Sequence, residues 1–302
     1  MAAALAAAFG WATYYLFVLW NTPGTSPSAI LFYPFAFGGA AYVAWAVAGG
    51  HGRLLAGLWR TPGAYLRTGL LIGAQLSILA ATYLTGPVDA SLLSLAGDVV
   101  VTPIFAALLF AGPRSTVRRP AVVAGLVLSL VGGTIAIVAG RRLAGVHGVA
   151  WAAVIVVPVA VGLYFLLSAR AADGVPASAV VGQTIVGAAA GGLLVAPLLP
   201  GGWPGIAAVA PVALGLLAAN GLISFFLSYA LYFFALGRAG VVVPPMLMTA
   251  IPIFTLALSV LVLGERFPLL ALAGIPIAVA GSVLALGASG PVSAEGWARP
   301  GA

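Results

Sequence analysis

Residues 250–286 read AIPIFTLALSVLVLGERFPLLALAGIPIAVAGSVLAL, two long apolar runs joined by a short turn. The only charged residues of this stretch, Glu265 and Arg266, lie in the turn from Gly264 to Pro268. The runs are continuously apolar rather than alternating, and a helix satisfies all of its backbone groups internally, as lipid requires. About 20 such residues cross the hydrocarbon core of a bilayer. The pattern therefore predicts two membrane-spanning helices.

The rest of the chain has the same composition. Of its 302 residues, 63% are hydrophobic and 6% are charged, whereas soluble domains have about 45–50% and about 25%. Such a chain carries too little charge to keep a globular surface in water, which excludes a soluble enzyme, a disordered tail and a secreted disulfide scaffold. Cysteine is absent, which also excludes thiolate catalysis and Cys-ligated metal.

Turn-rich or arginine-bearing breaks divide the chain into ten apolar runs of roughly 20 residues. The breaks lie at residues 21–27, 49–62, 86–89, 112–120, 140–148, 170–176, 200–204, 237–240 and 264–268, with a tail after about residue 287. We therefore predict an all-α membrane protein with ten transmembrane helices. The first run, Ala2 to Trp20, has no basic region before it and no small-residue cleavage site. It is predicted to be a retained span rather than a signal peptide.

The arginines predict the orientation. With the N-terminus in the cytoplasm, nine arginines fall on the cytoplasmic side, namely Arg53, Arg60, Arg67, Arg114, Arg118, Arg119, Arg170, Arg238 and Arg299. Three, Arg141, Arg142 and Arg266, fall outside. This satisfies the positive-inside rule with both termini cytoplasmic. The arginines form no basic face, so no nucleic-acid partner is expected. Plentiful Arg, Ala and Gly without Lys is typical of a GC-rich bacterial genome, which predicts a bacterial inner membrane.

A shift of 149 residues aligns the two halves of the chain. It pairs Tyr15 with Tyr164, Pro27 with Pro176, Gly38 with Gly187, Tyr83 with Tyr232, residues 103–105 with 252–254, Gly125 with Gly274, and Gly132 with Gly281. We interpret this as a duplication, with one repeat at residues 1–144 and the second at 145–302, ending in a short cytoplasmic tail. Five helices per repeat is an odd number, so the second repeat must be inverted. Inverted repeats of secondary transporters place a substrate site near the midplane between them.

The end of the second half carries a motif. Pro252-Ile253-Phe254 is followed by Leu263-Gly264-Glu265-Arg266 and by a glycine-spaced last run. With its five-plus-five spans, the chain resembles the EamA type of the drug/metabolite transporter superfamily, and its aromatic first run is most similar to the YddG-type aromatic amino-acid exporters. The resemblance implies transport of small solutes. One departure is that the first half ends in residues 110–113, Phe-Ala-Gly-Pro, without the glutamate.

Polar and aromatic side chains recur on the predicted helices at spacings that place them on common faces. The candidate cavity residues are Trp11, Tyr14, Tyr15, Gln75, Thr82, Tyr83, Ser94, Asp98, Tyr164, Gln183, Asn220, Ser224, Ser228, Tyr232 and Met248. A polar stripe that faced lipid would be unfavourable, so we expect these side chains to face the interior and line a cavity. The alternative is hydrogen bonding between helices alone.

Asp98 is the one acidic residue expected well inside a span, where an ionised carboxylate costs about 2.5–3.5 kcal/mol. It is predicted to bind a substrate amino group or a proton, or alternatively to be a carboxylic acid that hydrogen-bonds a Ser or Tyr hydroxyl for packing. Pro103 and its equivalent Pro252 each remove a helical hydrogen bond and are predicted to kink their helices. Glu265 and Arg266 are expected to have a structural or gating role.

The polar and charged side chains expected within the spans also indicate which substrates are favoured. One intramembrane Asp cannot form a catalytic dyad, and the two histidines lie in loops, so neither enzymatic activity nor a metal or other cofactor is expected. No Arg is expected well within a span, which disfavours a phosphate-bearing solute. A small zwitterion suits Asp98, the amide and hydroxyl donors, and the aromatic surfaces.

The leading hypothesis is an exporter of small amino acids, aromatic or apolar, that works by alternating access. The alternatives are efflux of a drug or another metabolite, and a membrane scaffold that does not transport. Small residues recur at a spacing of four, as in Gly187 with Gly191, Gly132 with Ala136 and Gly140, and Gly274 with Ala278. They predict close helix contacts within a monomer in the lipid bilayer. Dimerisation through the fifth and tenth spans is the other interpretation.

Overall fold

The computed structural model describes residues 2–21, 24–97, 101, 104–105, 108, 118–139, 149–171, 175–203, 205, 208–239 and 247–289. Within these ranges all regular secondary structure is helical, so the predicted all-α class is confirmed. The helices are α1 (Ala2–Asn21), α2 (Pro27–Ala48), α3 (Gly52–Leu58), α4 (Pro62–Thr85), α5 (Pro87–Ala96), α8 (Pro120–Ala139), α9 (Val149–Ala171), α10 (Ala177–Val195), the 3-10 helix η3 (Ala196–Leu198), α11 (Pro211–Asn220), the π-helix η5 (Gly221–Leu227), α12 (Ser228–Ala239), α14 (Ala250–Leu263) and α15 (Leu269–Ser289).

Proline and glycine set the helix boundaries. Proline occupies the first position of α2, α4, α5 and α11, where its missing N–H and fixed φ cost nothing. At the other end of a helix, Gly264 adopts φ 66° and ends α14, a left-handed conformation that favours glycine. The backbone N–H of Glu265 then donates to the carbonyl of Ser259 at 3.1 Å. The turn predicted at residues 264–268 is thus observed.

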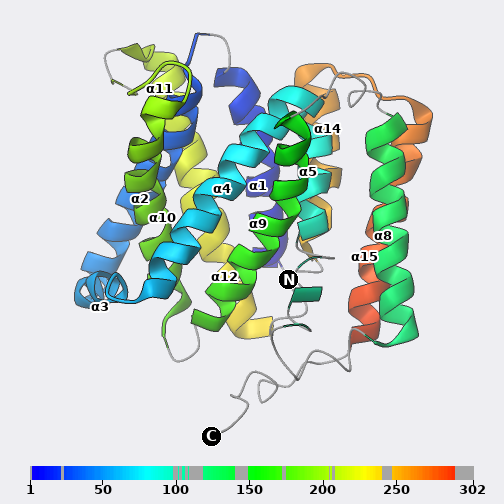
Figure 1. Ribbon diagram of the computed structural model, residues 1–302, viewed down its shortest axis with the longest axis horizontal. Coiled ribbons are helices and arrows are strands. Elements are labelled where there is room, and N and C mark those ends of the chain that lie inside the picture. The colour runs from blue at the N-terminus through cyan, green and yellow to red at the C-terminus, as the bar shows by residue number, and fades with distance from the viewer. Residues whose placement is uncertain are drawn as a thin grey trace, which may run out of the picture.

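Many of the helices are long and apolar enough to cross a membrane. Among the residues that the structure describes, five segments meet both criteria, namely 2–21, 27–48, 62–85, 179–198 and 211–235. Five shorter apolar helices accompany them, at 87–96, 120–136, 156–168, 250–263 and 269–285. Figure 1 shows these helices arranged side by side as one bundle, with α3 at its lower end and the start of α11 at its upper end. Large apolar side chains such as Leu194, Leu261 and Leu269 are 77–85% exposed on its outside, as expected of a surface that meets lipid.

α1 lies in the interior of the bundle. It packs against α4, α5, α11, η5, α12 and α14, and its buried alanines, including Ala7, Ala8 and Ala12, are at most 1% exposed. Small side chains let neighbouring helix backbones approach closely. The wider aromatic side chains of α1 are grouped around its middle, and they meet the other aromatic residues of the core there.

α8 and α15 form a separate close pair at one edge of the bundle (Figure 1). A Cβ on Gly132 would lie 2.7 Å from the carbonyl oxygen of Gly274, and one on Gly125 would lie 2.6 Å from that of Gly281. The side chains of Ser129 and Ser282 share a hydrogen bond of 3.0 Å between the two helices. The glycines singled out by their spacing therefore bring two helices of one chain into backbone contact.

Candidate substrate cavity

A cavity of about 60 Å³ lies at mid-length of the helices. Its walls come from α1, α4, α9, η5, α12 and α14. The lining residues are Trp11, Tyr14, Tyr15, Leu71, Ala74, Gln75, Ile78, Val161, Tyr164, Phe165, Ser224, Phe225, Tyr229 and Ile251. Half of them belong to residues 1–144 and half to 145–302. The cavity is thus shared evenly by the two halves of the chain.

Six of the sequence-predicted residues line this cavity, namely Trp11, Tyr14, Tyr15, Gln75, Tyr164 and Ser224. The first three are spaced i, i+3 and i+4 on α1, which places them on one face of the helix. That face meets aromatic residues of the second half. The ring of Trp11 lies 5.8 Å from Phe165, 5.0 Å from Tyr229 and 5.2 Å from Tyr232. Sequence spacing within one helix could not indicate Phe165 and Tyr229, because they approach from other helices.

Polar groups interrupt the aromatic wall. The Tyr15 hydroxyl donates to Ser94 Oγ at 3.0 Å, and Ser224 Oγ donates to the carbonyl of Gly10 at 3.0 Å. Gln75 Oε1 is buried, and no group of the described residues donates a hydrogen bond to it. A buried acceptor without a donor costs about 1–3 kcal/mol. Gln75 is therefore suited to accept a hydrogen bond from a molecule that enters the cavity.

The stripe Asn220, Ser224, Ser228 and Tyr232 does not face the cavity as a unit. Residues 221–227 form the π-helix η5, whose hydrogen bonds run from i to i+5. Ser224 and Ser228 both face Gly10 of α1, since Ser224 Oγ donates to the Gly10 carbonyl and a Cβ on Gly10 would meet Ser228 Oγ. Ser224 lines the cavity, whereas Ser228 is buried and donates to the carbonyl of Ile223 at 2.8 Å. Asn220 is fully buried outside the lining.

The remaining predicted residues of the cavity lie elsewhere. Thr82 donates to the carbonyl of Ile78 in its own helix at 2.8 Å. Tyr83 is 38% exposed, because eight residues beyond Gln75 means about 12 Å along α4 and about 80° around it. Met248 is buried, at 1% exposure, outside the lining. Asp98 and Pro103 lie outside the described residues.

Pro252 lies beside a break in its helix. It is the third residue of α14 and follows a turn at Thr249, and residues 247–248 before that turn are helical. The N–H groups of a first helical turn have no intrahelical partner, so proline is tolerated there. Whether Pro252 acts as a hinge stays a prediction.

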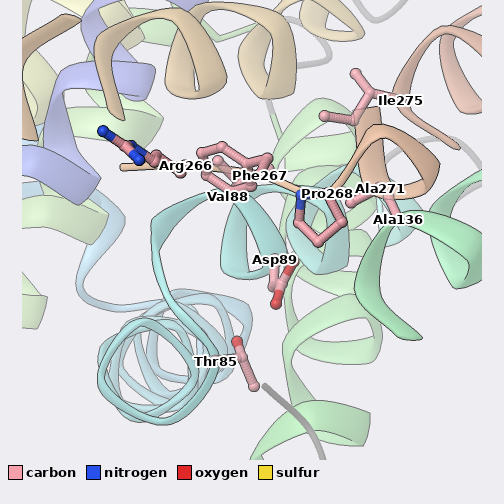
Figure 2. A pocket seen from close by; sticks show the side chains of 9 residues that line it. All are labelled: Thr85, Val88, Asp89, Ala136, Arg266, Phe267, Pro268, Ala271 and Ile275. Atoms are coloured by element: carbon pink, nitrogen blue, oxygen red, sulfur yellow. The ribbon is translucent and has the colours of Figure 1, made fainter. Parts of the chain in front are cut away.

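A smaller cavity of about 30 Å³ lies where α5, α8 and α15 meet. Figure 2 shows Asp89 and Arg266 among its lining residues, with the guanidinium of Arg266 pointing away from the Asp89 carboxylate. Asp89 is only 5% exposed, although its place in a predicted break suggested a loop. It follows Pro87 in the first turn of α5, where the helix dipole favours a negative charge. Neither Glu265 nor Arg266 lines the larger cavity.

Arg67, one of the nine arginines expected on the cytoplasmic side, is buried. It lies in the second turn of α4, near the end of that helix, and is 5% exposed. Its Nη2 donates to Gln183 Oε1 on α10 at 3.0 Å. A cationic side chain is therefore held between α4 and α10, and the predicted orientation stays a prediction. Across the described ranges, no group of three or more His, Asp or Glu residues could hold a metal ion.

A bundle of apolar helices around a shared aromatic cavity is typical of a membrane protein that handles small molecules. In agreement with this, residues 148–287 match the model of the EamA-like transporter family. The matched residues lie in the second half of the chain, and the matched family, one of transporters, belongs to the superfamily that the sequence motif predicted.

The fold also has a solved counterpart. The chain is similar to a structure titled "Crystal structure of protein", with a TM-score of 0.69 and 21% sequence identity over 94% of this chain and 94% of that chain. At this identity the likeness concerns the fold alone, and it extends over nearly the whole chain. No curated protein matches the chain.

Proposed function

We propose that this protein exports small amino acids, aromatic or apolar, across a bacterial inner membrane by alternating access. The observation that carries the proposal is the cavity that both halves line at mid-length. Its aromatic walls suit an apolar side chain and can hold an ammonium group by cation–π contact. Gln75 and the tyrosine hydroxyls suit the polar end of the same solute.

We further propose ten spans in two inverted repeats, of residues 1–144 and 145–302. At the shift of 149 residues, Gly125 is equivalent to Gly274 and Gly132 to Gly281. Gly125 contacts Gly281, which is the equivalent of Gly132, and Gly132 contacts Gly274, which is the equivalent of Gly125. This is the contact pattern of a two-fold axis. The lining supports it too, because it contains the equivalent pairs Tyr15 with Tyr164 and Gln75 with Ser224.

The volume of the cavity supports a mechanism that involves movement. At about 60 Å³ the cavity is narrow for an amino acid. Separation of the surrounding helices, as occurs in alternating access, would make room for the solute. We propose that the monomer is the working unit, with both termini in the cytoplasm.

Counterflow in proteoliposomes tests this function. Vesicles that hold the purified protein and a high internal concentration of unlabelled phenylalanine should take up labelled phenylalanine, and other apolar amino acids should compete. Gln75→Leu removes the cavity acceptor at similar volume and should lower uptake at least fivefold. Asp98→Asn tests the proposed site for the amino group and should also lower it.

Two outcomes would contradict the proposal. Competition by apolar cations but by no amino acid would favour drug efflux. No uptake of any solute by a correctly folded protein would favour a membrane scaffold.

A further inference from the structure

Arg67 is a buried cation at the contact of α4 with α10. It is 5% exposed, and its Nη2 donates to Gln183 Oε1 at 3.0 Å. Gln183 in turn donates from Nε2 to Thr68 Oγ1 at 3.4 Å. Arg67 Nε is buried, and none of the described residues accepts a hydrogen bond from it. The guanidinium therefore keeps one buried donor for a ligand that the described residues do not supply.

The charge of Arg67 is not balanced by the carboxylates that the structure describes. Asp89 follows the far end of α4, about 27 Å along the axis from Arg67 to Thr85. Glu265 is also remote from Arg67, because its neighbour Arg266 lines the same small cavity as Asp89. A buried guanidinium without an anion is costly, and more so within a membrane. An anionic partner would lower this cost.

The position of Arg67 connects it to the substrate cavity. Arg67, Leu71, Gln75 and Ile78 follow one another at spacings of four, four and three along α4, which places them on one helix face. The last three line the cavity. Arg67 also interacts electrostatically with Tyr164, another lining residue. Its Nη1 lies 3.3 Å from where a Cβ on Gly63 would be, so the side chain extends from the cavity face toward the end of the bundle that holds α3.

We infer that Arg67 binds the carboxylate of the transported solute as it passes between the cavity and the α3 end of the bundle. The inference rests on the proposed function and deepens it. A guanidinium pairs with a carboxylate through two parallel N–H donors, and the Arg67–Gln183 hydrogen bond opens to release one of them. A single positive charge among amide and hydroxyl groups matches a carboxylate monoanion better than a phosphate dianion.

The test compares two solutes that differ only in the carboxylate. Labelled phenylalanine and labelled phenylalaninamide are measured by counterflow with the wild type, Arg67→Gln, Arg67→Lys and the control Arg60→Gln, whose arginine is exposed near the same end. Arg67→Gln should raise the KM for phenylalanine at least tenfold and change that for the amide less than twofold. Arg67→Lys, which keeps the charge but not the bidentate geometry, should lie between. Arg60→Gln should match the wild type.

Other outcomes separate the two proposals. Equal losses for both solutes in Arg67→Gln, with an unchanged size-exclusion profile, would show a structural role and overturn the inference while the transport function stands. Unchanged kinetics in that variant, or competition by phenyl phosphate but not by carboxylates, would overturn it as well. If the wild type transports neither solute, the proposed function fails. In that case thermal unfolding still tests the anion site. Stronger stabilisation of the wild type by phenylalanine than by phenylalaninamide, lost in Arg67→Gln, would support the site, and equal stabilisation by the two would reject it.

Discussion

At the scale of single residues, Trp11 organises the cavity. Its ring contacts Phe165, Tyr229 and Tyr232, so one side chain of the first half touches three of the second. Aromatic pairs of this kind contribute about 0.5–1.5 kcal/mol each beyond the burial of their surface. Trp11 therefore both forms the wall and ties the two halves together at mid-length.

We expect Trp11→Ala to lower phenylalanine counterflow at least tenfold, because the solute loses its largest apolar contact surface. The matched control is Trp20→Ala, on the same helix but 43% exposed near its end, which should retain at least half of the activity. Initial rates in proteoliposomes of equal protein content provide the measurement. Equal losses in the two variants would mean that tryptophan at position 11 has no special relation to the cavity.

At the scale of elements, α8 and α15 show how glycine sets a helix pair. Gly132 and Gly274 bring the backbones together, and Ser129 and Ser282 add a hydrogen bond. Between helices in lipid, van der Waals contact and such hydrogen bonds replace the hydrophobic driving force that water supplies. The pair therefore depends on the absence of side chains at a few positions.

Gly132→Leu should destabilise the protein by about 1–3 kcal/mol or more, because the new side chain would have to displace the backbone of α15. Gly133→Leu is the control, since a Cβ on Gly133 meets nothing within 4 Å. Thermal unfolding in detergent, followed by size-exclusion chromatography, should show a lower midpoint for Gly132→Leu only. The idea fails if both variants unfold at the wild-type temperature.

The π-helix η5 is a second feature of this scale. It interrupts the helix from Pro211 to Ala239 at the level of the cavity, and it presents Ser224 and Phe225 to the lining. π-helical turns are rare and are frequent at functional sites. Here Ser224 and Ser228, which follows directly after η5, both face Gly10 of α1.

At the scale of the whole molecule, the proposed topology is testable because the chain contains no cysteine. α3 and the start of α11 lie toward opposite ends of the bundle (Figure 1). His51 directly precedes α3, Ala208 lies three residues before α11, and both are exposed. A single cysteine at either position reports on one side of the membrane. The distribution of arginines predicts that His51 lies on the cytoplasmic side.

We expect a membrane-impermeant maleimide to label Ala208→Cys in intact cells and to leave His51→Cys unlabelled until the cells are opened. Labelling of both sites in opened cells serves as the control for reactivity. The reverse pattern would invert the proposed orientation, and labelling of both in intact cells would contradict a span between them.

The sequence alone determined the all-α class and several helix limits, such as the starts of α2, α4 and α5 at proline and the end of α14 at Gly264. Apolar runs, prolines at helix starts and Gly264 act through neighbours within one or two turns, so their consequences can be derived without a partner. The same local information placed Trp11, Tyr14 and Tyr15 on one face of α1, and that face does line the cavity.

Only the tertiary structure decided which faces meet. Phe165 and Tyr229 approach Trp11 from more than 150 residues away, and Tyr83 turns outward. Ser224 lines the cavity, whereas Asn220 of the same predicted stripe is buried outside the lining. The burial of Arg67 and Asp89 depends on α10 and α15, which are remote in the chain. These outcomes follow from packing between distant segments, and helical periodicity carries no information about which segment lies opposite.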